Sequence, residues 1–191
     1  SLLAAYSASF GNGITATLSA ESRRFRQQTA TGTVGAVQAP GNTMLYGGTR
    51  MPDIIGAINI KQSWGEAQLS GAVRQLNDIS PIVSTSYGGA IHVGVSLNLP
   101  MLAPKDHIYV LGSEAVGALS YLGGTTGVEG TAGPLSGLGV AFADAYVNAA
   151  GTGLSPARGF QITGGFRHFW TPALRSALGV IYTNVDAPGA A

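Results

Sequence analysis

The chain has 191 residues, of which 45% are hydrophobic and only 10% are charged, with 29 glycines, no cysteine and a formal net charge of +1. Soluble domains carry about 25% charged residues, so this composition argues against a surface that faces only water. The net charge near zero argues against a nucleic-acid partner, and the lack of cysteine excludes disulfide scaffolds. No stretch approaches the roughly 20 apolar residues of a membrane-spanning helix.

Hydrophobic and polar residues alternate with a period of two along most of the chain, the pattern of β-strands with two different faces. Between residues 91 and 99, isoleucine, valine and leucine hold the odd positions, while His92, Ser96 and Asn98 are among the even ones. The same pattern predicts eight strands in chain order, over residues 2–10, 14–25, 51–62, 67–77, 86–98, 107–120, 158–169 and 174–185.

The links between these strands alternate between short and long. If the strands are antiparallel, all short turns lie at one end of the sheet and all long links at the other. That arrangement is typical of an all-β, antiparallel transmembrane β-barrel, whereas a soluble β-sandwich explains the alternation but not the sorting. Residues 121–157 are the least clear, and within them 133–150 fit a short helix, an extra strand or a folded loop; we favour a loop. The short links are 11–13, 63–66, 99–106 and 171–173, and the long ones 26–50, 78–85 and 121–157.

Two sets of side chains are candidates for a role in a barrel. Aromatic residues at the short turns are candidates for a girdle at the lipid headgroups: Phe10, Trp64, Phe169 and Trp170. Charged and histidine side chains on the polar face are candidate pore-lining residues, because charge facing lipid is costly. They are Glu21, Arg23, Asp53, Lys61, Arg74, His92, Arg167 and Arg175.

The alternative for the charged set is that its members form ion pairs that brace the wall, or lie at the rim. Lysine and arginine outnumber the acids in it, which favours a weak preference for anions.

Other chemistry has weak support. Gly11, Gly13 and Ala16 match a loose nucleotide-binding pattern, but a strand follows them instead of the helix that the pattern requires. The three histidines have no metal-binding spacing, and no G-x-S-x-G motif supports a hydrolase that uses His92 or His168 with a serine. The sequence therefore predicts no enzyme activity, no cofactor and no metal.

Four segments resemble the porins of alphaproteobacterial outer membranes. They are YSASFGNG from Tyr6, RMPDIIGAINIKQSWGEAQLSGAV from Arg50, NLPMLAPKDHIYV from Asn98 and FRHFWTPALRSALG from Phe166. The resemblance implies a homotrimer of 16-stranded barrels in the outer membrane, each with a loop folded into the channel. We expect residues 1–191 to be a single partial domain of about half such a barrel. The N-terminal strands, the constriction loop and the aromatic C-terminal strand of the family would lie outside it.

The function expected from this resemblance is a passive, water-filled channel for ions and small hydrophilic solutes. Its partners would be outer-membrane lipid, two further copies of the chain and the solutes in transit. A small, plugged eight-stranded barrel that serves as an anchor or adhesin is the main alternative, since eight strands leave an interior that side chains can fill. A soluble binding module is a third interpretation.

Overall fold

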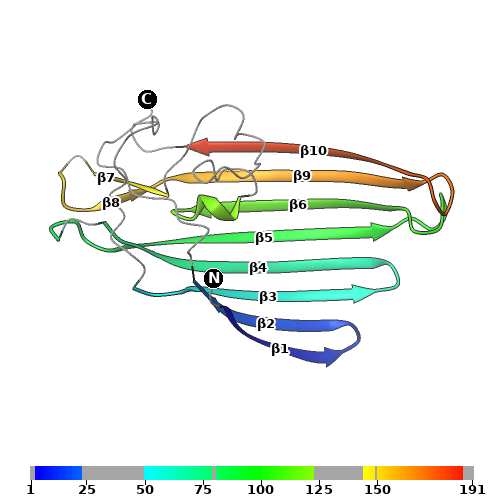
Figure 1. Ribbon diagram of the computed structural model, residues 1–191, viewed down its shortest axis with the longest axis horizontal. Helices are drawn as coiled ribbons and strands as arrows, with labels where there is room; N and C mark the ends of the chain where they lie inside the picture. The colour runs from blue at the N-terminus through cyan, green and yellow to red at the C-terminus, as the bar shows by residue number, and fades with distance from the viewer. Residues whose placement is uncertain (1–2, 23–49, 79–80, 123–143, 149, 187–191) are drawn as a thin grey trace.

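A computed structural model describes residues 3–22, 50–78, 81–122, 144–148 and 150–186. Within them, eight long strands form one antiparallel sheet whose members pair in chain order (Figure 1). Strands β1 and β10 are the two edges and do not pair with each other, so the described sheet is open. The strands are β1 (Leu3–Gly11), β2 (Ile14–Glu21), β3 (Asp53–Gln62), β4 (Gly65–Leu76), β5 (Ser86–Asn98), β6 (His107–Val116), β9 (Arg158–Phe169) and β10 (Arg175–Asp186).

The predicted all-β, antiparallel architecture is confirmed, and each long strand coincides with one of the eight predicted segments. The short turns β1–β2, β3–β4, β5–β6 and β9–β10 lie together at one end of the sheet, on the right of Figure 1. The chain leaves the other end in longer links. The described part contains no helix long and apolar enough to cross a membrane.

Two strands end earlier than predicted, at the points where the chain enters long links. The strand expected over 107–120 ends at Val116, because Gly117 has φ +63 and its N–H donates to the carbonyl of Ala157 instead of continuing the sheet. A 3-10 turn, η1 (Leu119–Tyr121), follows. The strand expected over 14–25 ends at Glu21, and its residues 23–25 lie outside the described residues.

The segment favoured as a loop, 121–157, contains a small second sheet. This hairpin consists of β7 (Ala145–Val147) and β8 (Leu154–Pro156), which pair antiparallel. Three-residue strands are too short to produce a visible alternation in a sequence rich in glycine and alanine, so the pattern could not reveal them.

The pairing register gives the main sheet two chemically different faces. One row across five strands reads Ser70, His92, Ser113, Gln161 and Thr183. The adjacent row, on the opposite face, contains a glycine and four hydrophobic residues: Leu69, Val93, Gly112, Ile162 and Tyr182.

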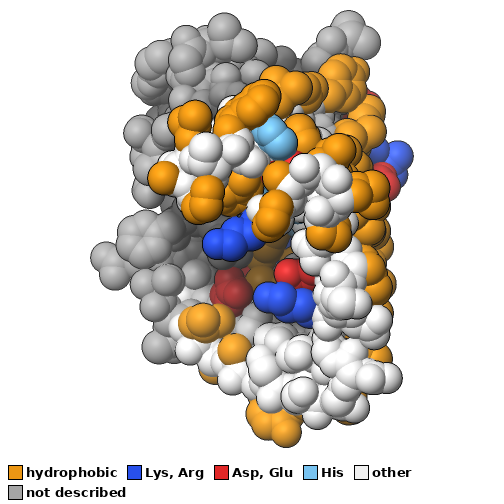
Figure 2. Space-filling model, turned by 90° about the vertical axis from the view of Figure 1, so that its right-hand side faces the viewer, with side chains coloured by type: hydrophobic (Ala, Val, Ile, Leu, Met, Phe, Trp, Pro, Cys, Tyr) orange, Lys and Arg blue, Asp and Glu red, His pale blue; other side chains and the backbone are white. Residues whose placement is uncertain are grey.

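We call the polar face the inner face and the apolar face the outer face. On the outer face Val93 is 51% exposed and Ile162 is 51% exposed, so large hydrophobic side chains lie uncovered there. Figure 2, viewed from the short turns, shows mainly hydrophobic side chains along the right of the view, with a few charged ones at the upper right edge and other charged side chains in the middle.

The buried core lies on the inner face, near the long links. Residues 117–122 and the β7–β8 hairpin pack there against Ala115, and Ala90 and Val185 contact the same cluster. Its buried members are Ala115, Ala118, Leu119, Leu122, Tyr146 and Ala157. The inner face is thus covered near the long links, while Lys61, Asn98 and Tyr109 remain exposed nearer the short turns.

Candidate functional site

The polar inner face is the candidate site, and its side chains bond to one another across neighbouring strands. Ser7 Oγ lies 2.8 Å from Thr17 Oγ1, and Gln161 Nε2 donates to Thr183 Oγ1 at 2.9 Å. At the short-turn end, Asn59 Nδ2 donates to Glu66 Oε1 at 2.6 Å. Serine, threonine and amide side chains that satisfy one another can also bond to water, so this face can border an aqueous space.

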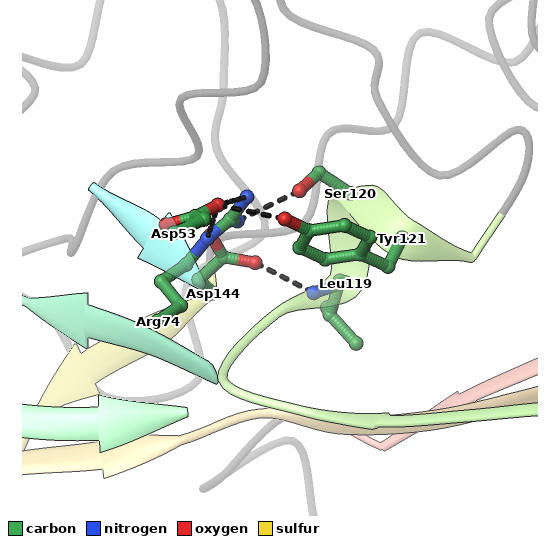
Figure 3. A network of polar contacts seen from close by, with 6 residues as sticks. All are labelled: Asp53, Arg74, Leu119, Ser120, Tyr121 and Asp144. Carbon is green, nitrogen blue, oxygen red and sulfur yellow. Dashed lines mark hydrogen bonds and ion pairs between the residues drawn. The ribbon is translucent and has the colours of Figure 1, made fainter. Parts of the chain in front are cut away.

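A buried cluster of hydrogen bonds and ion pairs surrounds Arg74 on this face (Figure 3). Arg74 projects from β4 and is 0% exposed. Its Nη2 donates to Asp53 Oδ2 at 2.8 Å, and its Nη1 donates to Asp144 Oδ2 at 2.7 Å. Nη1 also lies 2.7 Å from Ser120 Oγ, and the guanidinium carbon is 4.9 Å from the centre of the Tyr121 ring.

The cluster binds the segments that follow β6 to the inner face of the main sheet. Tyr121, in η1, has two contacts with the cluster. Its OH donates to Asp53 Oδ2 at 2.9 Å, and its ring lies against the Arg74 guanidinium. Asp144, just before β7, accepts the Leu119 N–H at 2.7 Å and therefore joins η1 to the hairpin as well as to Arg74. A guanidinium matches this role, because its fork of N–H donors serves several acceptors at once. Arg74 thus positions two separated segments over the inner face.

The predicted pore-lining residues fall into three groups. Register places Glu21, Asp53, Lys61, Arg74, His92, Arg167 and Arg175 on the inner face. Lys61 and Arg175 are exposed, whereas Glu21, His92 and Arg167 are half-buried. Asp53 and Arg74 are buried against each other and Asp144, which is the bracing arrangement of the alternative interpretation. Arg23 lies outside the described residues, and the pore-lining role stays a prediction for the set.

His92 is the residue that most resembles part of a catalytic pair. Its Nδ1 lies 2.7 Å from Ser113 Oγ, directly across from it on β6, and its ring meets Tyr121 edge to face. Within the described part of the chain, no carboxylate bonds to His92 to orient it as in a triad. In that same part, no group of three or more histidine and acidic side chains is arranged to hold a metal. The pair is therefore best understood as a cross-strand contact between β5 and β6.

The four girdle candidates all lie at the short-turn end. Trp64 Nε1 donates to Gln62 Oε1 at 3.2 Å, and Trp170 Nε1 donates to Ser176 Oγ at 3.0 Å. Phe10 is 69% exposed and Trp170 64% exposed, while Phe169 is half-buried. An exposed ring with its N–H bonded is suited to a boundary between apolar and polar surroundings. The girdle itself stays a prediction.

Asp106 is a structural residue that the sequence pattern did not reveal. It ends the turn between β5 and β6, is buried, and accepts the Phe169 N–H at 2.8 Å. Its other oxygen lies 2.6 Å from His168 Nδ1. Burial alone would raise the pKa of the Asp106 carboxyl, but the bonds from His168 and Phe169 outweigh it and hold that pKa below its ordinary value. Because its partners are 62 and 63 residues away, no local signal marked this contact.

The lowered pKa of Asp106 gives an expected pH dependence. The ionised carboxylate stabilises the folded state above its ordinary pKa of 3.8, and this contribution is lost as the pH falls through the lowered value. The urea midpoint of the chain in detergent should therefore fall between pH 6 and pH 3 by more than it does in Asp106→Asn. Asp186→Asn, at the exposed end of β10, is the control and should keep the wild-type pH dependence. An equal fall in Asp106→Asn would contradict this account.

Comparison with known proteins gives one positive result. The family model described as porin subfamily matches residues 3–186. No curated protein and no solved structure matches the chain.

Proposed function

The chain belongs to the porin family, and we propose that it forms part of the wall of a water-filled channel in a bacterial outer membrane. Ions and small hydrophilic solutes would diffuse through this channel down their gradients, with no catalytic step and no cofactor. Porins in general pass small solutes and form trimers, so the proposal includes two further copies of the chain and the surrounding lipid as partners.

The observation that carries the proposal is the division of the sheet into a polar and an apolar face. Lipid offers no hydrogen-bond partners, so a spanning sheet needs a hydrophobic outer face and keeps its polar side chains inside. The row from Leu69 to Tyr182 meets the first requirement, and the row from Ser70 to Thr183 meets the second. An Arg or Lys on the lipid side costs about 2–4 kcal/mol at the membrane midplane, which favours water on the face that carries Lys61 and Arg167.

We further propose that this sheet is one section of a larger closed wall. In lipid, the unpaired edges of β1 and β10 would leave backbone groups without partners, so both edges must pair with further strands. The alternative of a plugged eight-stranded barrel would require β1 to pair with β10, and they are not paired in the described sheet.

Conductance across a planar bilayer tests the proposed function. The chain, refolded in detergent and inserted, should give discrete, long-lived and ohmic current steps, in groups of three if the trimer forms. In the predicted pore-lining set basic residues outnumber acidic ones, which favours a weak preference for anions that the reversal potential in a salt gradient measures. Folded, inserted protein that gives no current steps would contradict a channel built from this chain alone and would assign conduction to the longer wall. A clear cation preference would contradict the anion selectivity alone.

A further inference from the structure

A cavity of about 300 Å³ lies between two of the short turns, away from the inner-face site. One wall comes from the turn between β5 and β6, and the other from the turn between β9 and β10. Its lining residues are Leu102, Ala103, Pro104 and Lys105 on the first wall and Phe169, Trp170, Thr171 and Pro172 on the second.

Hydrogen bonds within each turn hold both walls in place. In the first turn, the Leu102 N–H donates to the carbonyl of Leu99 at 3.0 Å. In the second, the Leu174 N–H lies 3.0 Å from Thr171 Oγ1. Asp106 joins the two, since its backbone belongs to the first turn and its carboxylate binds the Phe169 N–H. The cavity is therefore preformed, and a ligand would not need to order it.

Among the residues that line this cavity, Lys105 carries a charge, and that charge is positive. Residues 99–107 and 167–175 contain three basic side chains, those of Lys105, Arg167 and Arg175, and one acidic side chain, that of Asp106. Asp106 is buried, and both of its carboxylate oxygens are already bonded, to His168 and to the Phe169 N–H. Lys105 lines the cavity and has φ +77, a conformation that residues other than glycine rarely adopt. An unfavourable backbone conformation kept at a lining lysine points to a role for its position.

The rest of the cavity and its surroundings are apolar. Met101 is 82% exposed, Leu102 60%, Trp170 64% and Leu174 60%, all beside the cavity. Trp170 Nε1 is bonded to Ser176, so the indole ring is fixed at the margin of the outer face. From there the outer face continues along β6 and β10 as exposed hydrophobic residues such as Val110 and Leu178. A ligand that fits must carry an anionic group and an apolar part.

We propose that this cavity binds the headgroup of an anionic glycerophospholipid from the membrane, with its phosphate at Lys105 and its acyl chains along the outer face of β6, β9 and β10. A lysine and a tryptophan at the end of an apolar surface are suited to that boundary, where charge attracts anionic lipid. The inference relies on the proposed contact between the outer face and lipid, but not on conduction through the inner face.

Native mass spectrometry of the full chain in detergent micelles tests this proposal with phosphatidylglycerol and with diacylglycerol of the same acyl length. Lys105→Gly removes the charge and suits φ +77, so it should fold at least as well as the native chain. We expect it to bind phosphatidylglycerol about fivefold more weakly and diacylglycerol equally well. Lys105→Arg should retain the binding of the native chain, and Lys61→Gln, at another turn, should change it less than twofold.

Three results would overturn the proposal. Unchanged phosphatidylglycerol binding in Lys105→Gly would remove the lysine from the site. An equal loss in Lys61→Gln would show general charge attraction. Displacement of the lipid by millimolar glycerol 3-phosphate would assign the cavity to a small free anion. Conductance recorded on the same samples separates this test from the channel, because loss of lipid binding with normal current steps concerns the cavity alone.

Discussion

Replacement of Arg74 by methionine is expected to destabilise the chain by about 3–5 kcal/mol, the range for removal of one partner from a buried ion pair. Methionine keeps much of the volume but leaves the carboxylates of Asp53 and Asp144 without the guanidinium that both contact. Charge that is buried without its partner is far costlier than the same charge in water. The midpoint of urea unfolding in detergent, followed by far-UV circular dichroism, measures the loss.

Two further variants separate the ion pair from a general loss of charge. Arg175→Met removes an exposed arginine from the same face and should change stability by no more than about 0.5 kcal/mol. Asp53→Asn and Asp144→Asn combined with Arg74→Met should be less destabilised than Arg74→Met alone, because the two buried side chains that lose the guanidinium are then uncharged. A loss below 1 kcal/mol in Arg74→Met would show that the cluster contributes little to folding.

The same variant has a consequence for the channel. Arg74 is a common partner of Ser120 in η1 and of Asp144, so its loss weakens the attachment of both segments to the inner face. Both segments lie on the inner face, which would border the water-filled channel. If they narrow the channel, Arg74→Met should increase the size of each current step and make the current noisier.

The strands and their faces were predictable because their signal is local. The alternation of polar and apolar residues along β5 or β9 is visible in consecutive residues. The short turns are the breaks between such segments. No such signal marked the short strands β7 and β8, or the end of β6 at Val116 before Gly117. In those places a glycine conformation and distant packing decided the structure.

The candidate site was predictable only in part. The charged residues of the polar face were identified from strand parity, but their partners were not. Arg74 meets Asp53 across 21 residues and Asp144 across 70, and Asp106 meets His168 across 62. Contacts between such distant residues depend on the folded sheet and on how the chain returns to it after β6. Sequence pattern could therefore place the charges on a face without telling which would be buried.

Replacement of Gly65 by alanine is expected to destabilise the chain by about 2–4 kcal/mol, because strain in the backbone and overpacking both oppose it. Gly65 begins β4 with φ +146, and a Cβ there would lie 1.9 Å from the carbonyl oxygen of Ser96 in β5. That oxygen belongs to backbone, so a whole strand would have to shift. The turn before it is fixed as well, since the Asn98 N–H donates to the carbonyl of Trp64 at 2.8 Å.

Gly56→Ala is the matched control for this second variant, since it adds the same methyl group to the neighbouring strand β3. A Cβ at Gly56 meets nothing within 4 Å, and alanine is favoured over glycine inside a strand by about 0.5–1 kcal/mol. Gly56→Ala should therefore unfold at the wild-type urea concentration or slightly above it, while Gly65→Ala unfolds well below it. Equal midpoints for the two variants would mean that the β3–β4 turn does not pack on β5 as described. The pairing register of β4 with β5, which separates the polar from the apolar face, would then be incorrect at this end of the sheet.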